Sequence, residues 1–230
     1  MSWETPPAAE GGGDAANLVS MAKESRPTGG RVKHGTAKAA KTSIVEAAVE
    51  FLWDHPVREL TAGELMRRTG LSRPAFYQYF RSVNDLMRTL LIDLQTEMLT
   101  VAAPWFDSDQ ERELAIERSL AGIIDVCVRR GPVFRAVAEA APFDPALEKA
   151  WGEFMQRWDG AVASQIVAEQ GRGLIDPDLD AVQVARSLNR LDAAMMVDEF
   201  GRRDQADPHV VLQTLHAIWT RTLYARSTSD

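Results

Sequence analysis

The chain contains a single cysteine, Cys127, so no disulfide bond can form within it, and a reducing compartment is expected. No apolar run approaches the roughly 18 residues that a membrane-spanning helix needs. The opening residues, MSWETPPAAEGGGD, are acidic and lack the apolar centre of a signal peptide. These absences predict a soluble, cytoplasmic protein with no membrane partner, and 45% hydrophobic residues suffice for a sizeable core.

Motifs of enzymes are also missing. The four histidines are scattered and form no metal-binding pair, and no G-x-S-x-G, P-loop or G-x-G-x-x-G occurs. Cys127 lies within an expected helix without an evident basic partner, which favours a buried packing role over a nucleophile. We therefore expect no enzymatic activity, no metal and no cofactor.

The net charge of −7 is unevenly distributed. Lys and Arg outnumber Asp and Glu by 11 to 6 between residues 25 and 91, but are outnumbered by 23 to 14 between residues 92 and 230. A basic N-terminal third on an acidic remainder is typical of a small DNA-binding head on a body without DNA contacts. Chance in the composition of a solvated surface could give the same split.

Residues 1–36 are rich in Gly, Pro, Ser and Ala without periodicity, which predicts a disordered tail. The end of the tail is basic. This region is either a solubilising tail or an arm that reaches DNA phosphates or the minor groove. Its basic residues and those that follow are Lys23, Arg26, Arg31, Lys33, Lys38 and Lys41.

Helical spacing of apolar residues predicts an all-α fold of about nine helices, with no convincing strand. One helix is expected over 42–55. A long one begins near Leu86 and is ended by Pro104, and two more over 111–130 and 133–141 are parted by Gly131 and Pro132. Three later helices begin after Asp144-Pro145, near Asp180 and after Asp207-Pro208, where an aspartate can cap the first turn. The first of these ends at Gly171-Arg172-Gly173.

Residues 61–86, TAGELMRRTGLSRPAFYQYFRSVNDL, predict a helix-turn-helix, whose second helix enters the major groove of DNA. Thr61 and Glu64 have the spacing of a capping box, and Gly70 lies where the turn needs a positive φ. Ser72 is expected to cap the second helix, which is very short. Phe76 and Phe80 face the core, so the outer face carries Arg73, Pro74, Ala75, Tyr77, Gln78 and Tyr79. The alternative is an ordinary αα-hairpin with half-buried tyrosines.

These residues resemble the TetR family of transcriptional regulators, through L-T-x-x-x-L, G-L-S and F-Y-x-Y-F at the spacing of that family. The C-terminal two thirds resemble its EthR-type repressors, through W-x-x-F-M-x-x-W from Trp151, L-N-x-x-D from Leu188 and H-x-I-W-x-x-x-x-Y from His216. The resemblance implies a helix-turn-helix DNA-binding domain over 37–84 and a helical ligand-binding and dimerisation domain over 85–230.

For DNA contacts, the resemblance implies that Arg73, Pro74 and Ala75 approach base edges and that Tyr77 and Tyr79 bind phosphates. Arg73 suits bidentate recognition of guanine. The family often has a lysine where this chain has Val83, and that contact is lost or taken over by Arg81 or Lys41. The full set of expected DNA-binding residues is Lys41, Thr61, Gly63, Ser72, Arg73, Pro74, Ala75, Tyr77, Gln78, Tyr79 and Arg81.

For a ligand, the resemblance implies an elongated apolar cavity that takes a small hydrophobic effector. Its expected lining is Ile124, Val128, Trp151, Met155, Trp158, Asn189, Asp192, Met196 and Trp219. A stripe of aromatic and Met side chains at helical spacing could equally be ordinary core.

Asn189 and Asp192 share a helix face and could orient a polar group of the effector. EthR-type relatives commonly have asparagine where Asp192 stands, so this pocket could prefer a donor or a cation. The alternative is a surface pair, or a salt bridge from Asp192 to Arg186 or Arg190.

In the family the last two helices pair across a two-fold axis, which gives the homodimer that a palindromic double-stranded operator requires. The predicted function is thus a ligand-responsive transcriptional regulator, of which repression is the commoner mode. One alternative is a helical interaction protein that has lost operator binding, which Val83 leaves open. A helical enzyme is a more remote alternative.

Overall fold

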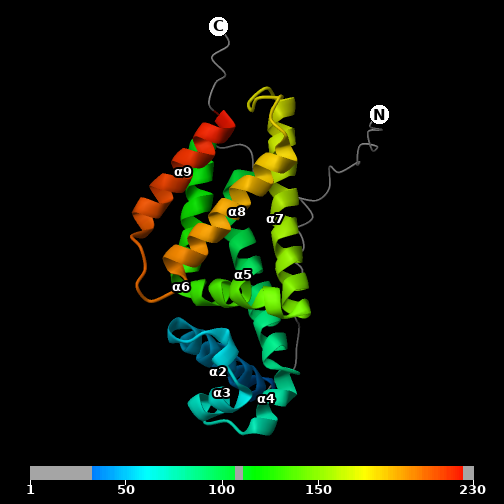
Figure 1. Cartoon of the computed structure of the whole chain (residues 1–230), viewed down its shortest axis with the longest axis vertical. Coiled ribbons are helices and arrows are strands. Elements are labelled where there is room, and N and C mark those ends of the chain that lie inside the picture. Colours follow the sequence, from blue (N-terminus) through cyan, green and yellow to red (C-terminus); the bar gives the residue numbers. More distant parts are fainter. Residues whose placement is uncertain (1–32, 107–110, 225–230) are drawn as a thin grey trace, which may run out of the picture.

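The computed structural model describes residues 33–106 and 111–224, and within these ranges the regular elements are all helical. A small head contains α2 (Lys33–Asp54), the 3-10 turn η1 (Val57–Glu59), α3 (Ala62–Thr69) and α4 (Arg73–Tyr79). Helix α5 (Val83–Phe106) runs from the head into the body (Figure 1). The body continues with α6 (Arg112–Ala140), η2 (Ala141–Phe143), α7 (Pro145–Gly171), α8 (Ala181–Phe200) and α9 (Pro208–Tyr224).

The core of the head is built from the apolar stripe that the sequence places on α2. Ile44, Ala48 and Leu52 are fully buried, and the rings of Phe76 on α4 and Phe80 directly after it close the core. In the body, α5 packs along α6, α8 packs on α7 and α6, and α9 packs on α6. Among the described residues, none of the helices has the length and apolar character required to cross a membrane.

Three helix starts in the body are capped by aspartates, as the sequence predicts. Asp144 Oδ1 accepts hydrogen bonds from Ala146 N and Leu147 N, each at 3.0 Å. Asp180 caps α8 in the same way, and Asp207 Oδ1 accepts from His209 N at 2.9 Å. These caps satisfy backbone N–H groups that a helix leaves unpaired at its start.

Helix α2 begins at Lys33, nine residues before the predicted start and inside the segment assigned to the tail. Of the proposed basic arm, Lys23, Arg26 and Arg31 lie outside the described residues. Helix α5 also passes Pro104, its predicted end, and continues to Phe106.

Contacts from α6 accompany this extra turn of α5. Ser119 Oγ donates to Ala102 O and accepts from Trp105 N. A side chain of α6 thus hydrogen-bonds two backbone groups in the last residues of α5, on either side of Pro104.

The prediction of two helices parted by Gly131 and Pro132 is wrong, because α6 is continuous through both residues. Pro132 has no N–H to donate to Val128 O, and Gln205 Nε2 donates to that oxygen instead, at 3.0 Å. Helix α6 bends rather than breaks, and its last part crosses between head and body (Figure 1). A distant side chain thus supplies the hydrogen bond that the proline removes.

Candidate DNA-binding surface and internal cavity

The turn between α3 and α4 has the geometry of a helix-turn-helix. Thr61 Oγ1 accepts from Glu64 N at 3.1 Å, and Gly70 has φ of 70°, in the left-handed region. The Glu64 carboxylate does not return to Thr61 but binds Arg67 and Arg68, each at 2.7 Å. These hydrogen bonds lower the pKa of Glu64 to about 2. Only half of the predicted capping box is formed.

Helix α4 turns its phenylalanines inward and the rest of its surface outward. Phe76 and Phe80 lie 5.6 Å apart between ring centroids and are 0% and 2% exposed. Tyr77 is 53% exposed, and Arg73 is also exposed. Ser72 occupies the N-cap position, but its hydroxyl makes no capping hydrogen bond within the described residues, contrary to the prediction.

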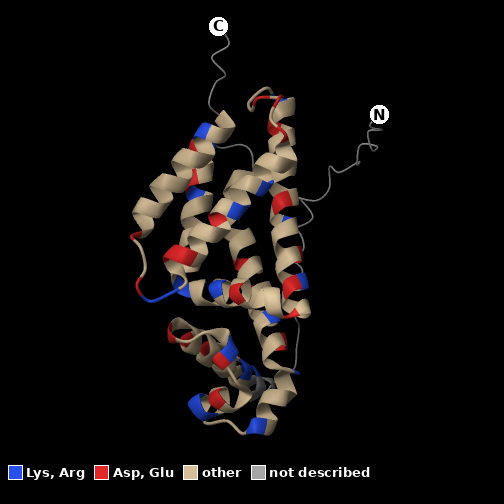
Figure 2. Ribbon diagram, in the orientation of Figure 1, with Lys and Arg blue, Asp and Glu red and all other residues tan. Residues whose placement is uncertain are grey.

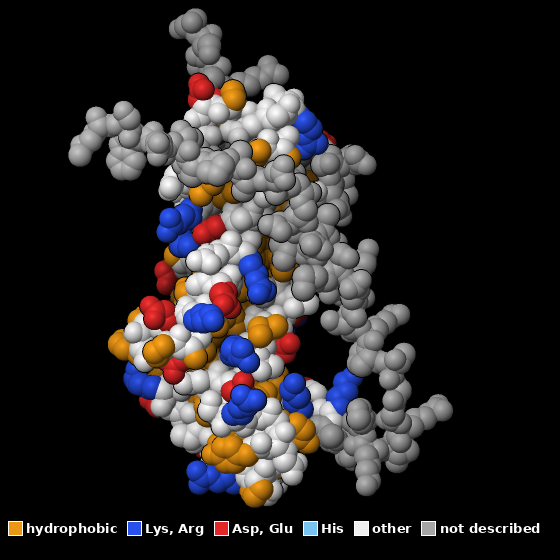
Figure 3. All heavy atoms as spheres, turned by 90° about the vertical axis from the view of Figure 1, so that its right-hand side faces the viewer, with side chains coloured by type: hydrophobic (Ala, Val, Ile, Leu, Met, Phe, Trp, Pro, Cys, Tyr) orange, Lys and Arg blue, Asp and Glu red, His pale blue; other side chains and the backbone are white. Residues whose placement is uncertain are grey.

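All eleven residues predicted to contact DNA lie on the head or just before α5, and nine of them are exposed. The other two, Ala75 and Tyr79, are partly buried. Lys41 on α2 comes close to α4, with Nζ 5.7 Å from the ring centroid of Phe80. Lys and Arg residues lie at the far end of the head in the ribbon view (Figure 2), and Figure 3 shows basic side chains on its surface there. The head therefore presents a solvent-facing helix with cationic and phenolic groups, as a DNA-reading helix requires.

The body contains a cavity bounded by α5, α6, α7, α8 and α9, which with its opening holds about 640 Å³ free of protein atoms. Its wall is largely apolar and includes the aromatic rings of Trp105, Phe106, Phe134, Phe154, Trp158 and Trp219. The rings of Trp105 and Trp219 meet edge to face at 5.2 Å.

The polar groups of the wall are few. Asp192 Oδ1 accepts from Trp219 Nε1 at 3.1 Å, and burial raises the pKa of Asp192 to about 7. Asn189 Nδ2 donates to Asp159 Oδ1 at 3.0 Å. Arg190 also binds Asp159. The salt bridge between Arg190 and Asp192, one alternative from the sequence, is therefore not formed.

Both parts of the chain match known families. Residues 44–90 match the family described as bacterial regulatory proteins, tetR family, and residues 116–225 match the family described as transcriptional regulator EthR, C-terminal domain. The chain belongs to the TetR family of transcriptional regulators. These families consist of regulators, which are not enzymes.

Relatives of this TetR-family protein cover nearly its whole described length. It is 27% identical over 206 residues to the HTH-type transcriptional regulator EthR of Mycobacterium tuberculosis, covering 88% of this chain and 95% of the relative. It is 27% identical over 213 residues to EthR of Mycolicibacterium smegmatis, covering 90% and 96%.

Solved structures share the fold at lower identity. NalD of Pseudomonas aeruginosa, the secondary repressor of the MexAB-OprM multidrug efflux pump, has a TM-score of 0.67 at 15% identity and covers 83% of this chain and 98% of its own. GusR of Salmonella enterica has a TM-score of 0.66 at 15% identity, covering 80% and 95%.

Six of the nine residues predicted to bind the ligand line the cavity: Met155, Trp158, Asn189, Asp192, Met196 and Trp219. The other three lie outside the lining. Ile124 is buried in the core, Val128 is partly buried beside it, and Trp151 stacks on Phe154 with ring centroids 5.5 Å apart. Ile124 and Val128 on α6, and Trp151 near the start of α7, belong to the hydrophobic core or pack against it.

Sequence reasoning missed most of the apolar wall. The missed residues are Met98, Ala102, Trp105, Phe106, Ile116, Ser119, Leu120, Ile123, Phe134, Phe154, Val162 and Ala193. On α6, Ile116, Leu120 and Ile123 have the helical spacing that could have identified this face. Helix α6 is apolar on more than one face, however, so spacing alone does not tell which face meets a cavity.

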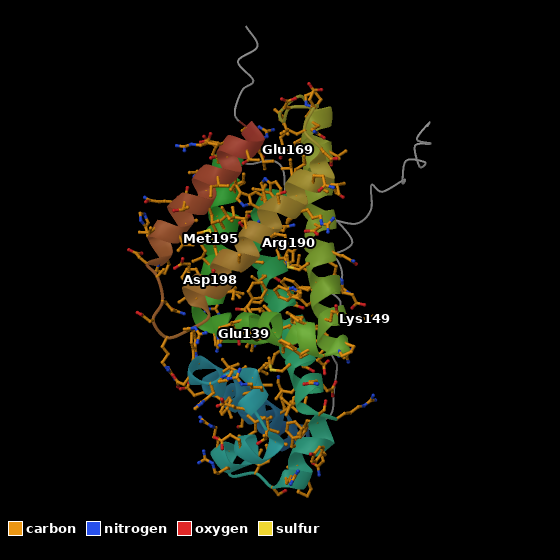
Figure 4. All side chains as sticks on the ribbon, in the orientation of Figure 1. Glu139, Lys149, Glu169, Arg190, Met195 and Asp198 are labelled. Atoms are coloured by element: carbon orange, nitrogen blue, oxygen red, sulfur yellow. The ribbon has the colours of Figure 1, made fainter. Side chains whose placement is uncertain are left out.

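A joint links the cavity to the head. Arg135, 3% exposed, donates from Nε to Gly201 O at 2.9 Å and from Nη2 to Leu52 O at 2.6 Å. These carbonyls lie at the ends of α8 and α2. Nη1 of Arg135 binds Glu139, which Figure 4 labels on the crossing part of α6. One side chain thus holds the last turns of helices from the head and the body.

Close backbone packing tightens the same joint. A Cβ atom at Gly131 would lie 2.0 Å from Phe200 O, so only glycine fits there. Arg203, between α8 and α9, binds Asp54 at 2.7 Å and Glu50 at 2.6 Å, both on α2.

Proposed function

We propose that this TetR-family protein is a repressor that binds a palindromic operator as a homodimer and is released by a small hydrophobic effector. The observation that carries the proposal is the orientation of α4. Phe76 and Phe80 fill the head core, which leaves Arg73 and Tyr77 free in solvent. A bundle hairpin with no DNA to contact has no need for this arrangement.

On DNA, Arg73 at the start of α4 reads base edges, where its guanidinium can donate twice to one guanine. Tyr77 and Tyr79 bind phosphates and fix the register of the head, together with Thr61 and Gly63 at the start of α3. The remaining contacts come from Lys41, Ser72, Pro74, Ala75, Gln78 and Arg81. Val83 is partly buried against the core and offers no charge to a phosphate.

The dimer forms through α8 and α9, whose outer surfaces retain apolar side chains. Val182 on α8 is 57% exposed and Val210 on α9 is 56% exposed. Leu191 and Met195 on α8, the latter labelled in Figure 4, are only partly buried, as is Ile218 on α9. A two-fold axis through this face would place two heads on successive major grooves.

The effector acts through the joint at Arg135. Phe134 lines the cavity and is next to Arg135, while Met196 lines it one turn before Phe200 and Gly201. A ligand that displaces Phe134 or Met196 shifts Arg135 or the end of α8 that it binds, and so changes the position of α2 relative to the body. Release follows if the ligand binds more tightly to the arrangement that does not fit DNA.

Selection from a random duplex library by the purified protein tests the proposal. We expect one enriched palindrome, bound with two protomers per site, and weaker binding after Arg73→Ala. Failure to enrich any sequence would contradict operator binding and favour the interaction protein that shares the fold.

A further inference from the structure

The cavity holds a carboxylate that has one hydrogen-bond donor and no cation among the described residues. Asp192 accepts only from Trp219 Nε1. Arg190, its basic neighbour on α8, is engaged with Asp159 at 3.1 Å, and Arg186 is exposed to solvent. An ionised carboxylate in an apolar enclosure is costly unless a positive charge or several donors compensate it.

The other polar groups of the wall do not supply that compensation. Ser119 Oγ donates to Ala102 O, and Trp105 Nε1 donates to Tyr224 Oη at 3.4 Å. Cys127 of α6 lies near Asp192, and burial together with that carboxylate raises the pKa of its thiol to about 12, so the thiol is neutral. Asn189, on the helix of Asp192, directs its amide at Asp159.

Aromatic rings line the same cavity as the carboxylate. Trp219 donates to it directly, and Trp105 and Trp158 belong to the same wall. Indole rings attract cations at their faces, with an energy that grows when water is excluded. Carboxylate and rings together form an environment for a positively charged group attached to an apolar body.

We propose that the effector is a hydrophobic amine, whose ammonium group pairs with Asp192 while its apolar body fills the aromatic cavity. This inference rests on the proposed function, since it names the chemical class of the molecule that the cavity takes. A neutral alcohol or a carboxylate of the same shape is discriminated against, because neither supplies the missing charge.

Three probes that share one apolar chain isolate the head group: decylamine, decan-1-ol and decanoate. Their binding to the full chain is measured by calorimetry at about pH 8, where Asp192 is ionised. We expect decylamine to bind roughly tenfold more tightly than decan-1-ol, and decanoate to bind most weakly.

Asp192→Asn keeps an acceptor for Trp219 and removes the charge, so decylamine should lose its advantage while decan-1-ol is unaffected. Asp198→Asn is the matched control, because Asp198 is an exposed carboxylate on the same helix (Figure 4). It should leave all three affinities unchanged.

Equal binding of the amine and the alcohol, an unchanged preference in Asp192→Asn, or no binding of any probe would each overturn the inference. Binding of duplex DNA by the unliganded protein is measured on the same samples. If the unliganded protein does not bind DNA, the proposed function fails. If it binds DNA but shows no preference for the amine, this inference alone fails.

Discussion

We propose that Arg73 and Tyr77, which share one short helix, perform different tasks on DNA. A guanidinium distinguishes bases by the pattern of acceptors in the major groove, whereas a phenol hydroxyl reaches phosphates that are the same in every sequence. Arg73→Ala should therefore change the preferred bases at one position of each half-site. Tyr77→Phe should weaken binding to all sequences alike. Affinity profiles of both variants on one operator library separate the two roles, and indistinguishable profiles would remove them.

Asp192 should make stability depend on pH in the direction opposite to a carboxyl group whose pKa is lowered by ion pairing. Burial raises its pKa from 3.8 to about 7, so between these values the folded chain retains a proton that the unfolded chain has lost. The free energy of unfolding therefore falls as pH rises through this window and levels off above it.

Asp192→Asn removes this loss. The free energy of unfolding of the variant, minus that of the wild type, should be roughly 2–3 kcal/mol larger at about pH 8 than at about pH 5. Urea unfolding at both pH values measures this difference. The comparison cancels the titration of every other carboxyl group. A stability difference that is the same at both pH values contradicts the raised pKa.

Residue-scale features that depend on near neighbours were predictable from the sequence. The cap at Thr61, the positive φ of Gly70 and the inward faces of Phe76 and Phe80 follow from spacing over four residues or fewer. The partner of Asp192 was not, because Trp219 lies 27 residues away on another helix. Local chemistry determines caps and turns, whereas tertiary packing decides which donor a buried carboxylate meets.

At the scale of helices, Pro104 and Pro132 do not end their helices, although the sequence predicts that they do. Helix α6 continues through Pro132, where Gln205 bonds the carbonyl that the proline leaves free, and α5 continues past Pro104 to Phe106. A sequence pattern shows the missing N–H but not the side chain that replaces it. The remaining helix starts at Asp144, Asp180 and Asp207 were predictable, since a cap lies within its own turn.

Gln205 should therefore be a stabilising residue of the bend. Gln205→Ala leaves Val128 O and Phe200 O without its donor, so we expect a loss of about 1–2 kcal/mol in the free energy of unfolding. Gln213→Ala, at an exposed position of α9, is the control and should change stability little. Urea unfolding measures both, and equal effects would mean that the bend does not need Gln205.

At the scale of the whole molecule, we propose that head and body communicate through the buried guanidinium of Arg135. Arg135→Met keeps much of the side-chain volume and removes the donors to Leu52 O and Gly201 O. We expect a bound effector to release DNA less effectively from this variant, while the affinity of the cavity for the effector stays the same. Anisotropy of labelled operator, with and without effector, measures the release.

Arg157→Met is the control for this coupling, because Arg157 is an exposed residue of α7. It should respond to the effector like the wild type. Normal release from Arg135→Met would show that the joint does not transmit the effect of the ligand.

The central claim is that the exposed face of α4 binds duplex DNA, and a salt titration tests it most directly. Each phosphate contact displaces counterions, so the logarithm of the association constant should fall steeply and linearly with the logarithm of salt concentration. Fluorescence anisotropy with a labelled duplex measures the slope for the wild type. An affinity that does not change with salt, or no binding at low salt, would contradict the account.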